Sequence, residues 1–365
     1  MAATASAASS RDRVVLKVDG RDYSGWESVR IARGVDRAAA DFTLAVTRQY
    51  WPITAGMACE VWIGADRLVT GYVDDVAHSH DSATHRIDVS GRSRTADLID
   101  CGASNRPGQW LGQTAQRIAD ELAGPFGVPV IVRDGGAPIP DHQLQQGETV
   151  MESLHRICAM RSLVPTDDVN GRLILHRPGS GGTAGALVAG QGGNVLKATV
   201  KFSQRDRFHT YIVKGQQAGF DIADPNQIAQ PTGTATDPNI RSNRVAVIIA
   251  ESQADADICA RRARWEAANR AGRGLDITVT VPGWRQADGR LWTVDQITSY
   301  RDDIIGLPAT SLLVAETVWT KGPDGTLTEM KLAPPAAYQP QPVVPLNPTL
   351  AGFAGLLRDE LKRNG

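Results

Sequence analysis

The sequence predicts a mainly β protein in which two similar small antiparallel β-barrels flank an inserted α+β module. Short runs of alternating apolar and polar residues occupy both terminal parts of the chain, and helical patterns lie between them. Turn formers are frequent, with 36 Gly and 20 Pro among 365 residues, and a chain of this length typically holds two or three domains.

Residues 1–95 are predicted to form the first barrel. Phe42, Leu44 and Val46 alternate with small or polar residues, as a half-buried strand requires. Five further strands are predicted, with Gly-containing turns between several of them: 14–18, 29–32, 59–63, 68–76 and 86–90. Six short strands with frequent turns are typical of a small barrel or sandwich.

Residues 96–193 are predicted to form the inserted α+β domain. The spacing of apolar residues predicts a helix over 109–122, which ends at Gly124-Pro125. A second helix begins at Thr149, where the pattern Thr149-x-x-Glu152 indicates a capping box. Two short strands complete this section, at 128–133 and 172–176.

The second barrel is predicted to consist of residues 194–214 together with 271–333. Strands are expected at six places: 195–201, 208–214, 275–281, 291–300, 311–321 and 326–332. Residues 215–270 are assigned to the inserted domain, as a long polar loop over 215–243 and a helix over 252–270 that begins at Ser252-x-x-Asp255.

A short pattern recurs in the two β-rich sections. Gly56-x4-Val61 followed by Leu68-Val69-x3-Val73 is matched by Gly289-x4-Val294 followed by Leu313-Val314-x3-Val318. Spacings this short also arise by chance, but the recurrence fits two related barrels on either side of an insertion.

Residues 334–365 are predicted to form a Pro-rich arm that ends in an amphipathic helix. Six prolines between Pro334 and Pro348 favour an extended segment that cannot join the interior of a sheet. Four large apolar residues then recur at helical spacing: Leu350, Phe353, Leu357 and Leu361. We predict that they bind a partner, with docking on the chain's own body as the alternative.

Charge and cysteine content exclude several classes of protein. With 39 basic and 40 acidic residues the net charge is −1, so bulk charge recruits neither nucleic acid nor an anionic membrane. No run approaches the roughly 18 apolar residues of a membrane helix, and the N-terminus lacks signal-peptide features. The four cysteines are widely spaced, which predicts neither a disulfide framework nor a zinc site: Cys59, Cys101, Cys158 and Cys259.

No residue pattern predicts a catalytic, cofactor or metal site, so we expect that the protein is not an enzyme. His78, His80 and His85 surround a predicted hairpin and could bind a metal, but a polar hairpin tip explains them better. Three acidic pairs are interpreted as turn or edge positions: Asp74-Asp75, Asp167-Asp168 and Asp302-Asp303. Four tryptophans are interpreted as core residues rather than stacking platforms: Trp110, Trp265, Trp284 and Trp292.

Several segments, taken in order, resemble one known family. The most specific is Ser90-Gly-Arg-Ser-Arg-Thr-Ala-Asp-Leu-Ile-Asp-Cys101. Five shorter segments accompany it: Val18–Trp26, Thr70–Asp74, Gln145–Thr149, Gly283–Arg285 and Gly289–Trp292. Together they resemble the baseplate hub protein of Mu-like contractile phage tails, over about residues 14–331.

The resemblance implies a virion structural protein of the tail baseplate, assembled in the bacterial host cytoplasm. It implies a homotrimer in which three subunits, each with two barrels, form a ring of six. Such a hub adapts the sixfold tail tube to the threefold central spike. The implied partners are the spike, the tube protein and other baseplate proteins, with DNA only passing through the lumen during ejection.

Two alternatives remain at this level. One is the hub of a related injection machine, such as an R-type tailocin or a type VI-like system. The other is a tail-associated peptidoglycan hydrolase, although no residue pattern here favours it.

Overall fold

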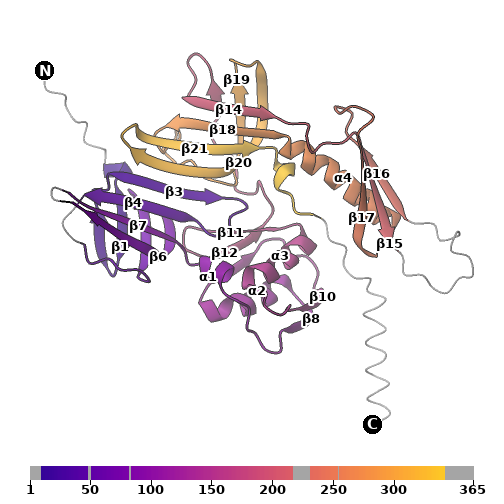
Figure 1. The fold of residues 1–365 in the computed structure, drawn as a ribbon, viewed down its shortest axis with the longest axis horizontal. Helices are drawn as coiled ribbons and strands as arrows, with labels where there is room; N and C mark the ends of the chain where they lie inside the picture. The colour runs from indigo at the N-terminus through magenta and orange to yellow at the C-terminus, as the bar shows by residue number, and fades with distance from the viewer. Residues whose placement is uncertain (1–9, 48–50, 82–83, 217–230, 254, 342–365) are drawn as a thin grey trace, which may run out of the picture.

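In a computed structural model, the described residues are 10–47, 51–81, 84–216, 231–253 and 255–341. They form a mainly β protein with four α-helices among the described residues (Figure 1). No helix in these ranges combines the length and the hydropathy needed to cross a membrane.

A 13-stranded sheet runs through both terminal parts of the chain. Its main path is β14-β18-β21-β20-β3-β4-β7-β6-β5-β1-β2, and β19 joins β20 to β13 beside this path. The N-terminal half supplies seven strands: β1 Val14–Val18, β2 Arg21–Ser24, β3 Ser28–Gly34, β4 Asp41–Thr47, β5 Ala58–Ile63, β6 Asp66–His80 and β7 His85–Ser93. The C-terminal half supplies six: β13 Leu187–Ala189, β14 Lys197–Phe202, β18 Leu275–Pro282, β19 Ile297–Asp302, β20 Leu307–Gly322 and β21 Gly325–Ala333.

Each half of the sheet covers its own core. In the N-terminal half, Phe42, Leu44 and Val46 point into one apolar cluster, which confirms the predicted alternation. In the C-terminal half, Ile277 and Val279 occupy a second cluster. Of the predicted 291–300 strand, only the end is extended, because β19 begins at Ile297.

The middle of the chain forms a separate α+β module beneath the sheet (Figure 1). Its elements are α1 Ala96–Asp100, β8 Gln109–Gln113, α2 Ala115–Ala123, β9 Val130–Val132, β10 Ile139–Gln143, α3 Val150–Arg161, β11 Val164–Asp167 and β12 Leu173–His176. A short 3-10 turn, Gly124–Phe126, follows α2, and the predicted capping box at Thr149 and Glu152 is confirmed.

The predicted helix over 109–122 is wrong at its start. Residues 109–113 form β8, which pairs with β10, and the helix begins only at Ala115. Two local features separate strand from helix: Gly112 has φ +61°, and the Thr114 hydroxyl accepts a hydrogen bond from the Arg117 N–H as an N-cap.

A third unit consists of a three-stranded sheet and a long helix. The strands are β15 Thr210–Gln216, β16 Thr232–Thr236 and β17 Val245–Gln253, and the helix is α4 Ala256–Arg273. This corrects the assignment of 208–214 to the second barrel, because β15 pairs with β16 and β17 and not with the large sheet. The apolar side of β15 is buried against α4. Tyr211 and Val213 on this side pack in one cluster with Cys259 of the helix.

Two further expectations in this region are wrong. The stretch 215–243, predicted as a loop, contains the strand β16, and its residues 217–230 lie outside the described residues. The helix does not begin at Ser252, which belongs to β17; its N-cap is Asp255, whose carboxylate accepts the Ile258 N–H at 2.8 Å.

Candidate assembly interface

The two halves of the sheet are joined by one strand pair, β3 with β20. The pairing is antiparallel, from Glu316 opposite Gly34 to Lys321 opposite Val29. Trp319 crosses this junction and is 1% exposed within the core of the N-terminal half, where Trp284 also packs. The junction therefore continues both the backbone ladder and the core from one half into the other.

A buried ion pair lies at the end of the junction. Arg33 of β3 donates to the Asp167 carboxylate at 2.9 Å and to the Leu68 carbonyl at 3.1 Å. Burial raises the pKa of Asp167, while the Arg33 guanidinium acts in the opposite direction. The pair links the first half of the sheet to β11 of the middle module.

The two halves share one strand order. β3-β4-β7-β6-β5 in the first half corresponds to β14-β18-β21-β20-β19 in the second, and every neighbouring pair in both sets is antiparallel. The long strands β6 and β20 occupy the same place, and each has a bulge toward its following strand. The similarity ends at the next strand, because β1 joins β5 antiparallel whereas β13 joins β19 in parallel.

Backbone hydrogen bonds fix the register of this repeat. Val73 accepts from the Gly56 N–H at 2.8 Å and donates to the Met57 carbonyl at 2.9 Å. Val314 makes the same two bonds, accepting from Asp295 at 2.9 Å and donating to Gln296 at 2.8 Å. Val73 therefore corresponds to Val314, so the alignment with Val318 inferred from the short sequence pattern is four residues out of register.

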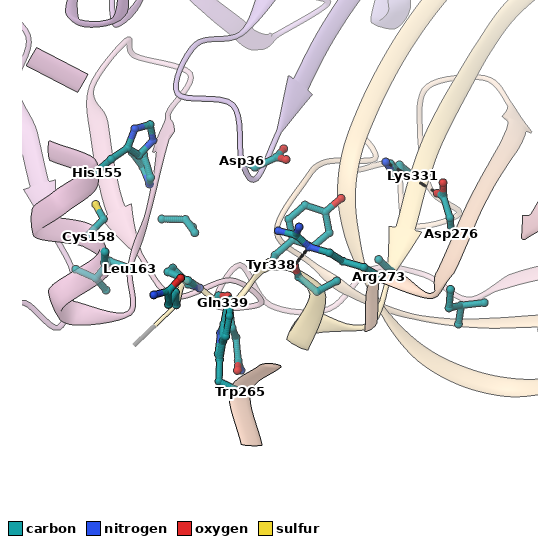
Figure 2. A pocket seen from close by; sticks show the side chains of 18 residues that line it. Asp36, His155, Cys158, Leu163, Trp265, Arg273, Asp276, Lys331, Tyr338 and Gln339 are labelled. Atoms are coloured by element: carbon teal, nitrogen blue, oxygen red, sulfur yellow. Dashed lines mark hydrogen bonds and ion pairs between the residues drawn. The ribbon is translucent and has the colours of Figure 1, made fainter. Parts of the chain in front are cut away.

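A groove of about 850 Å³ lies where the middle module, α4 and residues 333–341 meet (Figure 2). The described part of the Pro-rich arm is held there by α4: Trp265 Nε1 donates to the Gln339 carbonyl at 3.0 Å, and Asn269 donates to the Ala337 carbonyl at 3.0 Å. This part of the arm, which includes a 3-10 turn at Pro335–Tyr338, therefore docks on the chain's own body. The predicted partner-binding residues lie outside the described residues: Leu350, Phe353, Leu357 and Leu361.

The groove wall holds a cysteine that is unsuited to nucleophilic chemistry. Cys158 is 2% exposed, and burial raises the pKa of its thiol to about 12. We expect its alkylation by iodoacetamide at pH 8 to be far slower in the folded protein than in urea, because only about one thiol in 10⁴ is ionised. Mass spectrometry of labelled peptides checks this; the partly exposed Cys101 serves as the control that reacts first, and equal rates would contradict it.

The other residues singled out in the sequence have structural roles. His78 and His85 do face each other across the predicted hairpin, with Nδ1 to Nε2 at 3.2 Å, but no cluster of three or more metal-binding groups occurs in the described part of the chain. Asp74 pairs with Arg92 at 2.7 Å, and Asp302 accepts the Tyr300 hydroxyl at 2.7 Å. Trp110, Trp284 and Trp292 are buried as predicted, whereas Trp265 lines the groove and corrects the core assignment.

Comparison with known proteins decides the family. Residues 13–93 match the N-terminal region of the Mu phage baseplate assembly protein GpP-like family, and 255–341 match the fourth domain of GpP. Residues 95–177 match the second domain of the baseplate hub protein gp44-like family. Baseplate hub protein gp44 of Escherichia phage Mu is 33% identical over 334 residues, which cover 88% of this chain and 87% of gp44. This chain belongs to the Mu phage baseplate hub protein family.

Solved structures agree with this family. The 43 kDa tail protein of prophage MuSo2 from Shewanella oneidensis is 33% identical to this chain. The two structures superimpose with a TM-score of 0.81, over 90% of this chain and 99% of the MuSo2 protein. A type VI secretion component of E. coli, described as similar to T4 tail proteins gp27 and gp5, shares the fold at a TM-score of 0.56 and 10% identity, over 91% of this chain and 80% of that one.

The family resemblance inferred from short segments is thus confirmed. The hub protein is a structural component of a Mu-like phage tail baseplate. Two sites were not identifiable in the sequence: the β3·β20 junction and the Arg33–Asp167 pair. In the sequence, Asp167 stands out only as one member of the acidic pair Asp167-Asp168.

Proposed function

We propose that the hub protein acts as a homotrimeric adaptor between the sixfold tail tube and the threefold central spike. The observation that supports this is the repeated strand order of β3-β4-β7-β6-β5 and β14-β18-β21-β20-β19 within one chain. Three copies of a chain with two matching units offer six matching units to one partner and a threefold surface to another.

Within this assembly, the two halves of the large sheet form small barrels that together build the ring. The middle module, from α1 to β12, lies outside the ring, and so does the unit formed by β15, β16, β17 and α4. The predicted inserted domain, 96–193, is too long at its end, because β13 pairs with β19 of the large sheet. This assignment keeps β14 in the second barrel and leaves β15 out of it, in agreement with their strand partners.

The ring encloses part of the channel through which DNA leaves. A chain with net charge −1 lacks the bulk positive charge that would retain a polyanion, which suits transient passage. The spike, the tube protein and other baseplate proteins are the partners of this adaptor, and the virion baseplate is its location.

Light scattering coupled to size-exclusion chromatography tests the proposal. The expected mass is three times the 39.1 kDa of one chain, in a particle that binds purified spike protein. A stable dimer, or a monomer that stays monomeric at high concentration and with the spike present, would contradict it.

A further inference from the structure

Several strand edges of the large sheet are unpaired among the described residues, and two of them are β14 and the distal part of β6. In the described part of the chain, β14 pairs only with β18, at the end of the sheet. The second open edge is the distal part of β6, Asp75–His80, which pairs with β7 on one side while its β5 ladder ends at Tyr72. Unpaired edges present free N–H and C=O groups that pair readily with another strand.

The β14 edge also carries exposed apolar side chains. Leu196 is 63% exposed and Phe202 is 66% exposed, on a protein whose other large apolar side chains are mostly buried. Pairing of this edge with another strand would remove part of this apolar surface from water.

These two edges are the counterparts of the strands that meet inside the chain. Ile31 of β3 corresponds to Val200 of β14. Ile31 pairs with Phe42 of β4 and Val200 pairs with Ile277 of β18, and these two partners lie opposite equivalent positions of β7 and β21. Taking Val73 as the equivalent of Val314, His78 of β6 corresponds to Trp319 of β20. The internal junction joins β3 to β20, so its equivalent would join β14 to β6.

We propose that β6 of one subunit pairs antiparallel with β14 of a second copy of this chain, in the register of the β3·β20 junction. In that register Ala77 faces the partner's Lys201, His78 faces the partner's Val200, and Ser79 faces the partner's Thr199. The proposal rests on the trimeric function above and specifies its contact. Because the pairing is head to tail, internal and intersubunit junctions alternate, and three copies close the ring.

The side chains at these edges are complementary. Asp75 lies two residues before Ala77 and thus diagonal to the partner's Lys201, within reach of long side chains. Both are exposed, and neither has an ion-pair partner among the residues that the structure describes. At the internal junction the equivalent acid, Glu316, pairs with Arg37 at 2.7 Å. On the opposite face, Val76, packed on its own core, meets the partner's Phe202.

Disulfide trapping tests the register in the full-length protein. Ser79→Cys with Thr199→Cys places thiols on directly opposed residues, where Cβ atoms lie about 4.5–5.5 Å apart, close enough for bridging after a small adjustment. Mild oxidation should give covalent dimers and trimers on non-reducing gels. Ser79→Cys with Val200→Cys is the matched control; its second thiol points to the other face of the sheet and should leave at least tenfold less cross-linked product.

A charge exchange gives a second test that does not depend on oxidation. Ala77→Lys introduces a lysine opposite the partner's Lys201 at an exposed position, so the fold is expected to persist while trimerisation weakens at least tenfold. Adding Lys201→Glu to the same chain should restore the trimer. A trimer that forms normally but neither cross-links at the matched pair nor responds to Ala77→Lys would overturn this pairing and leave the adaptor function intact. A chain that never trimerises would count against both.

Discussion

The Arg33→Met variant is expected to lose about 3–5 kcal/mol of unfolding free energy. Arg33 and the Asp167 side chain are both almost fully buried, so removing the cation leaves a buried carboxylate without its counter-ion. Equilibrium urea unfolding, followed by tryptophan fluorescence, measures the loss.

A matched control lies on the same strand. Arg30 pairs with Asp41 near the surface, so Arg30→Met should lower the unfolding free energy by less than about 1 kcal/mol.

The pH dependence of the Arg33→Met variant adds a further check. Without Arg33 the folded-state pKa of Asp167 rises further above its unfolded value, so the loss should shrink as the pH is lowered and the folded state takes up a proton. Equal losses for the two arginine variants would contradict this role.

Replacing Trp319 by alanine is expected to lower the unfolding free energy by about 3–5 kcal/mol. This is the range for truncating a large aromatic side chain in a protein core. Trp319 comes from β20 yet fills the core of the other half, so the cavity would open at the junction itself. Thermal unfolding should therefore shift to lower temperature for both halves of the sheet together.

Trp62→Ala serves as the comparison. Trp62 lies on β5 in the same half, is only partly buried and stacks against Lys17 and Arg67 on the surface. The loss of unfolding free energy in Trp62→Ala should be less than half of the loss in Trp319→Ala. A comparable loss for both would mean that the junction is not a site of tight packing.

Local sequence patterns predicted strands well where one face is buried. The alternation of Phe42, Leu44 and Val46 places β4 correctly, and the Thr149–Glu152 pair marks the start of α3. The same reasoning failed over 109–113, where apolar residues happen to fall at helical spacing while Gly112 and Thr114 separate a strand from the helix.

Long-range pairing could not be predicted from the sequence. The alternating residues of β15 indicate a strand but do not say which sheet it joins, and the cover supplied by α4 decides that. The repeat was detectable, yet its register depended on backbone bonds at Val73 and Val314, which any side chain can make. For the same reason nothing in the sequence pointed to the pairing of β3 with β20.

A cryo-electron microscopy reconstruction of the purified, full-length hub, refined without imposed symmetry, tests the central claim most directly. We predict a closed annulus of three chains in which six sheet-rich lobes alternate between the N-terminal and C-terminal halves around one axis. A reconstruction with any other number of chains, or with the two halves of each chain at different distances from that axis, would contradict it.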